Sequence, residues 1–290
     1  MKLIHTANML GGQDGAFWKE YLFRFDAKGN GIVYDAAVLD AETGEPAELK
    51  QIGRFSVCPE EGLIPHFNAV VFGTEYYAPE DEFPLLYANI YNNYAKYIKQ
   101  ADPLPGVCCV YRLQRRDREF AMTLVQVIRV GFTETPLWRS AGDVVDVRPY
   151  GNFVIDREKQ LLYAFTMRDA DRTTRYFAFK LPKLSQGRYS EAFGVNVVTL
   201  EEGDILDRFD VEYHHYIQGA CCHEGKIYST EGFDETIHPA IRIISPTEHR
   251  QLLHVDLADL GYPKEAEWID FRKGKCYYSD AHGKVYRLEF

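Results

Sequence analysis

The stretch from Tyr216 to Leu257 constrains the fold of this chain most strongly, because it reads as four short strands separated by turns. Each run is four to seven residues long and is bounded by Gly, Pro, Asp or Glu. Short runs that favour β-branched and aromatic residues, with turn residues between them, predict antiparallel strands. The four runs are Gly219–Cys222, Lys226–Thr230, Ala240–Ile244 and Gln251–Leu257.

Similar groups of strands recur along the chain, and we call each group a copy. The first copy comprises Ala16–Trp18, Tyr21–Phe25, Gly31–Tyr34 and Glu48–Ile52. The second comprises Asn68–Phe72, Pro84–Ile90, Val107–Tyr111 and Met122–Ile128. The third comprises Phe153–Ile155, Leu161–Phe165, Arg175–Phe179 and Val197–Leu200, and the stretch described above is the fourth. The fifth has only Glu267–Ile269, Lys275–Tyr278 and Lys284–Phe290.

Four antiparallel strands in about forty residues make one blade of a β-propeller. The strand that the fifth copy lacks is supplied by Lys2–Thr6, which belongs to no other copy. Closure by the opposite terminus removes two strand edges. The sequence therefore predicts an all-β, five-bladed propeller that forms a single domain over residues 1–290.

Two other architectures fit the sequence less well. A sixth blade would have to lie in the interval between Asn68 and Asn152, where only four strand-like runs occur. A β-sandwich followed by a second β domain would need a linker, and no stretch rich in Pro, Gly and Ser divides the chain. One five-bladed ring is preferred.

The charge of the chain limits its partners. The formal net charge is −10, and the only cluster of basic residues is the short run from Arg112 to Arg118, which we interpret as a solvated hairpin tip. Nucleic acids and anionic membranes require clustered Lys and Arg, so neither is expected as a partner. No stretch approaches the roughly 18 apolar residues of a membrane span, and the start at Met1–His5 has no apolar signal region. We expect a cytoplasmic monomer.

The six cysteines match no zinc-site spacing, and most of them lie in predicted strands with apolar neighbours. Neighbouring residues of a strand point to opposite faces, so the two adjacent pairs cannot easily form disulfides internally. We expect six buried free thiols, at Cys58, Cys108, Cys109, Cys221, Cys222 and Cys276.

Alignment of the copies on their second-strand aromatic residue suggests a functional site. Phe23, Tyr163, Tyr228 and Tyr277 share one position, and Gln13, Phe153, Gln218 and Glu267 stand ten residues earlier. Asn152 is one place from that position in the third copy, and the second copy offers His66 and Asn68. The start of each innermost strand lies at one mouth of a propeller's central channel, so these polar groups are expected to converge there. They could bind a small polar ligand or a metal ion, or they could only bond crowded backbone and channel water.

Histidines give weaker evidence for a functional site at the same predicted mouth. His5, His66 and the pair His214–His215 precede or begin strands of three copies. Imidazole could act there as a base or as a metal ligand. No Ser-His-Asp, glycine-rich phosphate-loop or HExxH motif is present to support a hydrolase, nucleotide or zincin site.

Two short segments resemble the repeat of five-bladed glutaminyl cyclotransferases. The first is Gln218-Gly219 followed by the run Gly225–Gly232 and by Ala240–Ile244, and the second is Glu265–Asp270 with Gly274–Tyr277. The resemblance implies a propeller fold and a catalytic carboxylate. The acid of that family's run has no counterpart at Ser229, and Glu231 stands two places later.

Three functions remain open from the sequence. The first is a propeller that binds a small polar molecule or a metal ion at the channel mouth. The second is an enzyme of the glutaminyl cyclotransferase or lactonase type, with Glu267 or Glu231 as general acid/base and Gln218, Asn68 and Gln13 orienting a carbonyl. The third is a protein-interaction scaffold that uses the aromatic segment Tyr87–Tyr97.

Overall fold

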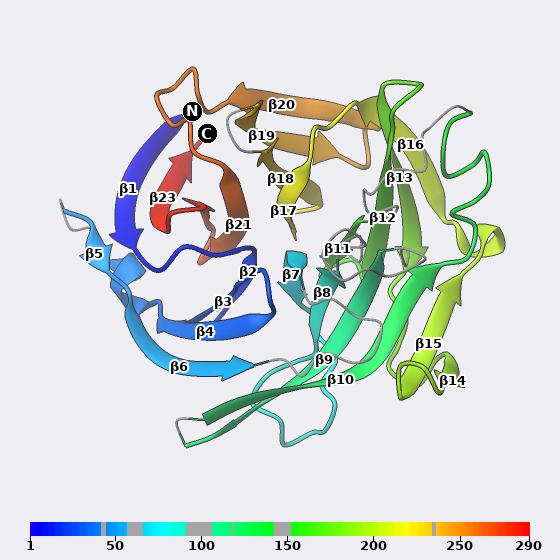
Figure 1. The fold of residues 1–290 in the computed structure, drawn as a ribbon, viewed down its shortest axis with the longest axis horizontal. Coiled ribbons are helices and arrows are strands. Elements are labelled where there is room, and N and C mark those ends of the chain that lie inside the picture. Colours follow the sequence, from blue (N-terminus) through cyan, green and yellow to red (C-terminus); the bar gives the residue numbers. More distant parts are fainter. Residues whose placement is uncertain (42–44, 57–65, 91–105, 118, 142–151, 234–235) are drawn as a thin grey trace.

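The computed structural model describes residues 1–41, 45–56, 66–90, 106–117, 119–141, 152–233 and 236–290. Over these ranges the chain is all β, with five sheets arranged in a ring around a central axis (Figure 1). This is a five-bladed β-propeller, as the sequence predicts.

Each blade is named by its order in the chain. Blade 1 contains β2 (Gly15–Trp18), β3 (Tyr21–Phe25), β4 (Asn30–Asp35) and β6 (Lys50–Ser56). Blade 2 contains β7 (Phe67–Phe72), β8 (Leu86–Ile90), β9 (Val107–Arg116), β10 (Glu119–Val130), β15 (Val195–Leu200) and β14 (Arg188–Ser190). Blade 3 contains β11 (Asn152–Asp156), β12 (Leu161–Arg168), β13 (Thr173–Lys180) and β16 (Asp207–Glu212).

The last two blades complete the ring. Blade 4 contains β17 (Ile217–His223), β18 (Lys226–Phe233), β19 (Ile237–Ser245) and β20 (Arg250–Asp256). Blade 5 contains β21 (Ala266–Arg272), β22 (Lys275–Asp280), β23 (Lys284–Glu289), β1 (Lys2–Asn8) and the short β5 (Ala47–Glu48). Two 3-10 helices, η1 (Ala37–Asp40) and η2 (Glu202–Asp204), lie in loops.

The two ends of the chain close the ring together. β1 pairs antiparallel with β23, from Lys2 opposite Glu289 to Asn8 opposite Lys284, with one irregularity between His5 and Ala7. The termini lie side by side in Figure 1. The predicted closure by the N-terminal strand is confirmed.

One predicted strand belongs to a different blade. Val197–Leu200 was expected to be the outer strand of the third copy, but it lies in β15, which pairs parallel with β10 of blade 2. The outer strand of blade 3 is β16, where Phe209 and Val211 are buried and alternate with exposed residues. That alternation is typical of a strand with one solvated face. A local apolar pattern predicts that a strand forms, but it does not say which sheet the strand joins.

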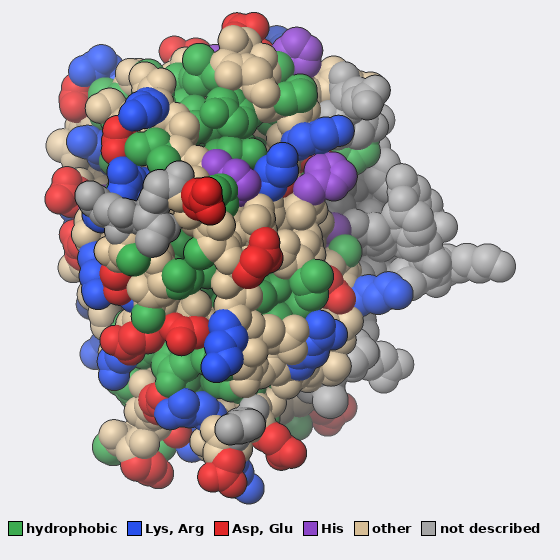
Figure 2. Space-filling model, turned by 90° about the vertical axis from the view of Figure 1, so that its left-hand side faces the viewer, with side chains coloured by type: hydrophobic (Ala, Val, Ile, Leu, Met, Phe, Trp, Pro, Cys, Tyr) green, Lys and Arg blue, Asp and Glu red, His purple; other side chains and the backbone are tan. Residues whose placement is uncertain are grey.

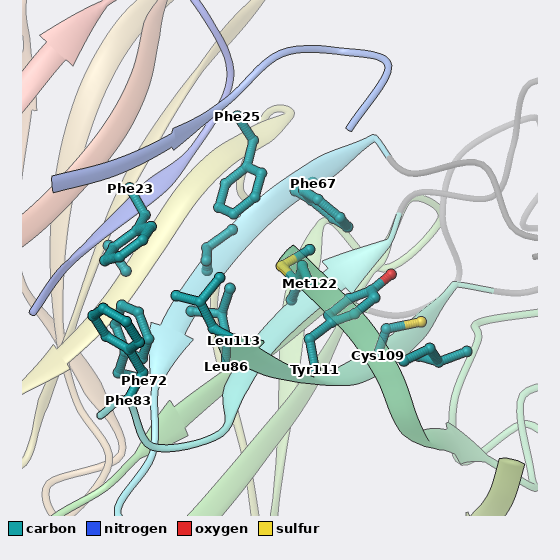
Figure 3. Close-up of a cluster of buried hydrophobic side chains, with 14 of the residues drawn as sticks. Phe23, Phe25, Phe67, Phe72, Phe83, Leu86, Cys109, Tyr111, Leu113 and Met122 are labelled. Atoms are coloured by element: carbon teal, nitrogen blue, oxygen red, sulfur yellow. The ribbon is translucent and has the colours of Figure 1, made fainter. Parts of the chain in front are cut away.

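The core consists of aromatic layers between neighbouring blades. Between blades 1 and 2, Phe23 packs edge-on against Phe72 and Phe83, with ring centroids 5.4 Å apart in both pairs (Figure 3). In the same layer Phe25 lies 4.9 Å from Phe67, again edge-on. Edge-to-face pairs at these distances are favourable beyond the area they bury. The layers therefore fix the blades relative to one another and to the axis.

The surface is mixed in charge. Figure 2 shows acidic and basic side chains interspersed with apolar ones on the side of the ring that holds β1 and β5. In the described part of the chain, no helix is long and apolar enough to span a membrane. The five cysteines described there, Cys108, Cys109, Cys221, Cys222 and Cys276, are free thiols, and Cys58 lies outside the described residues.

Candidate functional site

The innermost strands of the five blades are β2, β7, β11, β17 and β21, and they surround the axis (Figure 1). Asp14, directly before β2, is fully buried among them. Its Oδ2 accepts a 2.7 Å hydrogen bond from the backbone N–H of Val70 in β7. On the β17 side, a Cβ placed on Gly219 would lie 3.1 Å from Asp14 Oδ1 and 3.0 Å from the carbonyl oxygen of Glu267. Asp14 of blade 1 is therefore bonded to blade 2 and lies close to Gly219 of blade 4 near the axis.

Arg24 brings a positive charge to the same region. This residue of β3 is 1% exposed, lies over the ring of Trp268, and donates from Nη2 to the carbonyl oxygen of Gly12 at 2.7 Å. Its Nε and Nη1 have no hydrogen-bond partner in the part of the chain that the structure describes. Burial lowers the pKa of Arg24 to about 10, against the opposing effect of Glu267 and Asp14. Arg24 therefore remains a cation at neutral pH.

Glu267 and Gln13 meet, as the alignment of the copies predicts. Gln13 Nε2 donates to Glu267 Oε1 at 3.3 Å, although the two residues are 254 positions apart. Glu267 is 4% exposed, and its Oε2 has no partner among the described residues. Gln13 is only half-buried. The pair thus links a buried carboxyl group to a half-buried amide.

The electrostatic environment favours the protonated form of both buried acids. Burial raises the pKa of Glu267 to about 8, with a further rise from the neighbouring charge of Glu265, while Arg24 and Gln13 lower it. Burial likewise raises the pKa of Asp14 well above its ordinary value, against hydrogen bonds from backbone N–H groups and the charge of Arg24. At neutral pH a proton can therefore reside on Glu267.

Gln218 lies in β17, the innermost strand of blade 4. Its Nε2 donates to Glu265 Oε1 at 2.6 Å and to the carbonyl oxygen of Gly232 at 2.8 Å. Glu265 directly precedes β21, which carries Glu267. Gln218 thus contacts the polar group through Glu265.

The second copy forms its own polar contact at β7. Asn68 accepts a short hydrogen bond from Asn89 Nδ2, and both residues are buried. His66 precedes β7, and burial lowers its pKa to about 4, so it is neutral at physiological pH. Asn152 begins β11, and its side chain lies outside the described part of the structure.

Glu231 lies in a separate cluster within blade 4, beside the chain that leads from blade 3. Arg242 holds it with two contacts, Nε to Oε2 at 3.0 Å and Nη2 to Oε1 at 2.9 Å, and His254 Nε2 lies 3.3 Å from Oε1. Burial raises the pKa of Glu231, but hydrogen bonds with His254 and Arg242 outweigh it and lower the pKa to about 2. Glu231 is therefore a permanently charged partner of a buried Arg.

The histidines do not form one group. His5 lies on β1, the fourth strand from the axis, and its ring bonds Asn8 and the carbonyl oxygen of Ala7, so its expected place at the mouth is wrong. His214 is fully buried, and its two ring nitrogens have no partner in the described ranges. Burial lowers its pKa to about 3. His215 donates its backbone N–H to Glu231 Oε2 at 3.1 Å.

The alignment of copies missed Asp14 and Arg24. Arg24 lies inside the strand Tyr21-Leu-Phe-Arg-Phe25, where a charge among apolar and aromatic residues was the available signal. Asp14 directly follows Gln13, but no other copy repeats it, so comparison of copies could not find it.

No protein-family model matches the sequence, and no curated protein matches it. Among solved structures, the chain is similar to an exo-β-1,3-galactanase from Phanerochaete chrysosporium, with a TM-score of 0.50 and 10% identity over 99% of this chain and 64% of that one. It is also similar to glutaminyl cyclase from Myxococcus xanthus, with a TM-score of 0.43 and 11% identity over 99% and 93% of the two chains. At these identities the similarity concerns the β-propeller fold alone.

Proposed function

We propose that the protein binds a small polar molecule at the mouth of its central channel, in contact with Asp14, Arg24 and Glu267. One observation carries the proposal. Four buried polar atoms of these residues have no hydrogen-bond partner in the described part of the chain: Asp14 Oδ1, Arg24 Nε and Nη1, and Glu267 Oε2. An unpaired buried polar group costs roughly 1–3 kcal/mol, so four of them together favour a bound partner.

The unpaired atoms define the chemistry of that partner. Arg24 offers two unpaired donor nitrogens, which call for a carbonyl, carboxylate or hydroxyl oxygen. Asp14 and Glu267 can accept a hydrogen bond, or donate one when protonated. A small neutral or zwitterionic molecule with adjacent hydroxyl, amide or carboxyl groups fits both requirements.

This arrangement favours an organic ligand over a metal ion. The buried guanidinium of Arg24 lies beside the two carboxyl groups and repels a cation. No group of three or more His, Cys, Asp or Glu side chains that could hold a metal ion occurs in the described ranges. The half-buried Gln13 and Gln218 would contact the ligand at the entrance.

An enzymatic role is the second candidate, and the pKa of Glu267 supports it. A carboxyl group with a pKa near 8 can both give and take a proton close to neutral pH. A cyclotransferase or lactonase reaction needs such a group beside a carbonyl, and Arg24 could hold that carbonyl oxygen. Glu231 is ionised and bound to Arg242, so we assign the proton transfer to Glu267.

We also propose that the protein works as a monomer in a reducing cytoplasm, where buried thiols such as Cys108 and Cys221 stay reduced. Burial raises the pKa of both thiols well above the ordinary value. A thiol held in the neutral form reacts slowly with oxidants.

A thermal-shift screen with amino acids, sugars and hydroxy acids tests the proposed function. A true ligand present at 100 times its Kd stabilises the folded protein by roughly 2.7 kcal/mol, which raises Tm. Glu267→Gln should weaken this rise, while Glu119→Gln, on an exposed position of β10, should leave it unchanged. Failure of every compound, or an equal shift in both variants, would argue against the site. Turnover that Glu267→Gln abolishes while binding persists would favour the enzymatic role.

A further inference from the structure

Residues 181–206 make an excursion from blade 3 across to blade 2, where they form β14 and β15. The buried side chain of Gln126 in β10 anchors the start of this segment. Its Nε2 donates to the carbonyl oxygens of Lys183, Leu184 and Gln186 at 2.9, 3.3 and 3.1 Å. Leu184 also donates its backbone N–H to Glu75 Oε2 at 3.1 Å. These hydrogen bonds attach the segment firmly to the propeller.

The excursion encloses a groove of about 1060 Å³ at the outer rim of the ring. In Figure 1 its strands β14 and β15 lie at the lower right, away from the inner strands. The floor is partly apolar, with Phe179, Phe193 and Leu206 among the lining residues. Leu206 is 63% exposed. The groove shares no lining residue with the site formed by Asp14, Arg24 and Glu267.

Two basic side chains that line the groove have no acidic partner in the described structure. Lys180 and Arg188 line it, and neither has a hydrogen bond or ion pair with any side chain in the described ranges. Arg129 lines it as well, and the two acids on its wall, Glu201 and Asp204, accept hydrogen bonds from backbone N–H groups in a reciprocal capping box on η2. With three cations against two carboxylates, the lining of this groove carries a net positive charge on a chain whose net charge is −10.

A free strand edge runs along the groove. β14 ends the six-stranded sheet and pairs only with β15, so the other side of its backbone has no neighbouring strand in the described structure. Tyr189, in the middle of β14, is 69% exposed. Next to the charged Arg188, this edge presents an aromatic side chain beside the partly apolar floor, and exposed apolar surface of this kind marks interaction sites.

We propose that this groove binds an extended, acidic peptide segment of a partner protein, which adds to β14 as a further strand. The free backbone edge supplies hydrogen bonds for the peptide, as in other β-augmented complexes. Lys180 and Arg188 pair with its acidic side chains, and the apolar floor takes every second residue.

Selection from a phage-displayed library of random short peptides tests the proposal. The wild-type protein is the bait, and Lys180→Glu/Arg188→Glu is the counter-selection. Selected sequences are expected to alternate acidic and apolar residues, and a synthetic peptide of that sequence should bind the double variant at least about tenfold more weakly. Lys2→Glu/Lys28→Glu, which makes the same change in net charge at exposed positions elsewhere, should bind it like the wild type.

Two outcomes would overturn the proposal. One is that no peptide is enriched over the counter-selection, or that the enriched peptides lack acidic residues. The other is that light scattering shows a dimer that Tyr189→Ser abolishes, because a second copy of the chain would then occupy the edge. Both double variants change exposed residues, so unchanged melting should confirm that they fold.

Discussion

The carboxylate of Asp270 in β21 accepts a 2.7 Å hydrogen bond from the backbone N–H of Phe17 in β2. Asp14, at the start of the same blade as Phe17, makes the equivalent bond to Val70 in β7. The buried Asp14 and the half-buried Asp270 therefore join the inner strand of blade 1 to blade 2 on one side and to blade 5 on the other. These bonds hold the inner strands of the three blades in fixed positions relative to one another.

Replacement of Asp14 tests this link. Asp14→Asn keeps an oxygen for the Val70 N–H and resembles the protonated acid that burial favours, so its stability should remain close to that of the wild type. Asp14→Ala leaves the N–H buried and unpaired, and should lower the free energy of unfolding by about 1–3 kcal/mol relative to Asp14→Asn. Urea unfolding of both variants measures the difference. Equal stability of the two would show that the link does not stabilise the ring.

The raised pKa of Glu267 should make stability depend on pH. Its folded pKa is about 8, whereas the unfolded value is about 4.3. Between these values the folded state keeps a proton that the unfolded state has released, so the free energy of unfolding falls as pH rises. The slope from this one group is at most about 1.4 kcal/mol per pH unit.

Glu267→Gln carries no titrating proton at this position and should remove that slope. Stability curves of wild type and variant are compared from about pH 5 to pH 8.5, a range that spans most of the window. The wild type should lose stability relative to the variant toward high pH. Curves that stay parallel across the range would contradict the raised pKa.

Closure by β1 predicts the effect of a truncation. Removal of residues 1–7 takes away most of the antiparallel pairing with β23 and leaves an unpaired strand edge. The truncated protein should melt at a lower temperature and aggregate as its concentration rises, as followed by calorimetry and light scattering. Removal of Met1 alone is the control. A truncated protein that stays monomeric with an unchanged Tm would refute closure of the ring by this strand.

Loss of one partner of the Glu231–Arg242 pair should lower the free energy of unfolding more than loss of both. Arg242→Met leaves the Glu231 carboxylate buried without its main partner and should cost about 3–5 kcal/mol. Adding Glu231→Gln to that variant should recover part of the loss, because the buried charge is then gone. The exposed pair Arg250–Glu248 is the control, and Arg250→Met should have little effect. Additive losses in the double variant would mean that the two side chains are not coupled.

The strands and the closure of the ring could be predicted because they depend on local patterns. β17 to β20 lie close to the ranges expected for the fourth copy, since alternating apolar residues and turn residues are local signals. β15 was assigned to the wrong blade because its parallel partner, β10, lies about seventy residues earlier in the chain. No local pattern encodes that pairing.

The site was only partly predictable for a related reason. Gln13 and Glu267 occupy equivalent positions of two copies, and a ring brings such positions to one axis, so their contact could be expected. Asp14 and Arg24 have no counterparts in the other copies, and their burial and unpaired polar atoms are visible only in the three-dimensional structure. The segment Tyr87–Tyr97, expected as a scaffold surface, begins with the buried Tyr87 in β8 and continues, after Ile90, outside the described residues.

The most direct test of the proposed ligand site is a crystal structure of the protein soaked with the strongest compound from the thermal-shift screen. We expect density for an organic molecule within hydrogen-bond distance of Arg24 Nη1 and Glu267 Oε2, with an oxygen of the molecule facing the guanidinium. Density for the compound at any other place, with Arg24 and Glu267 bonded only to water or to each other, would contradict the proposed ligand site.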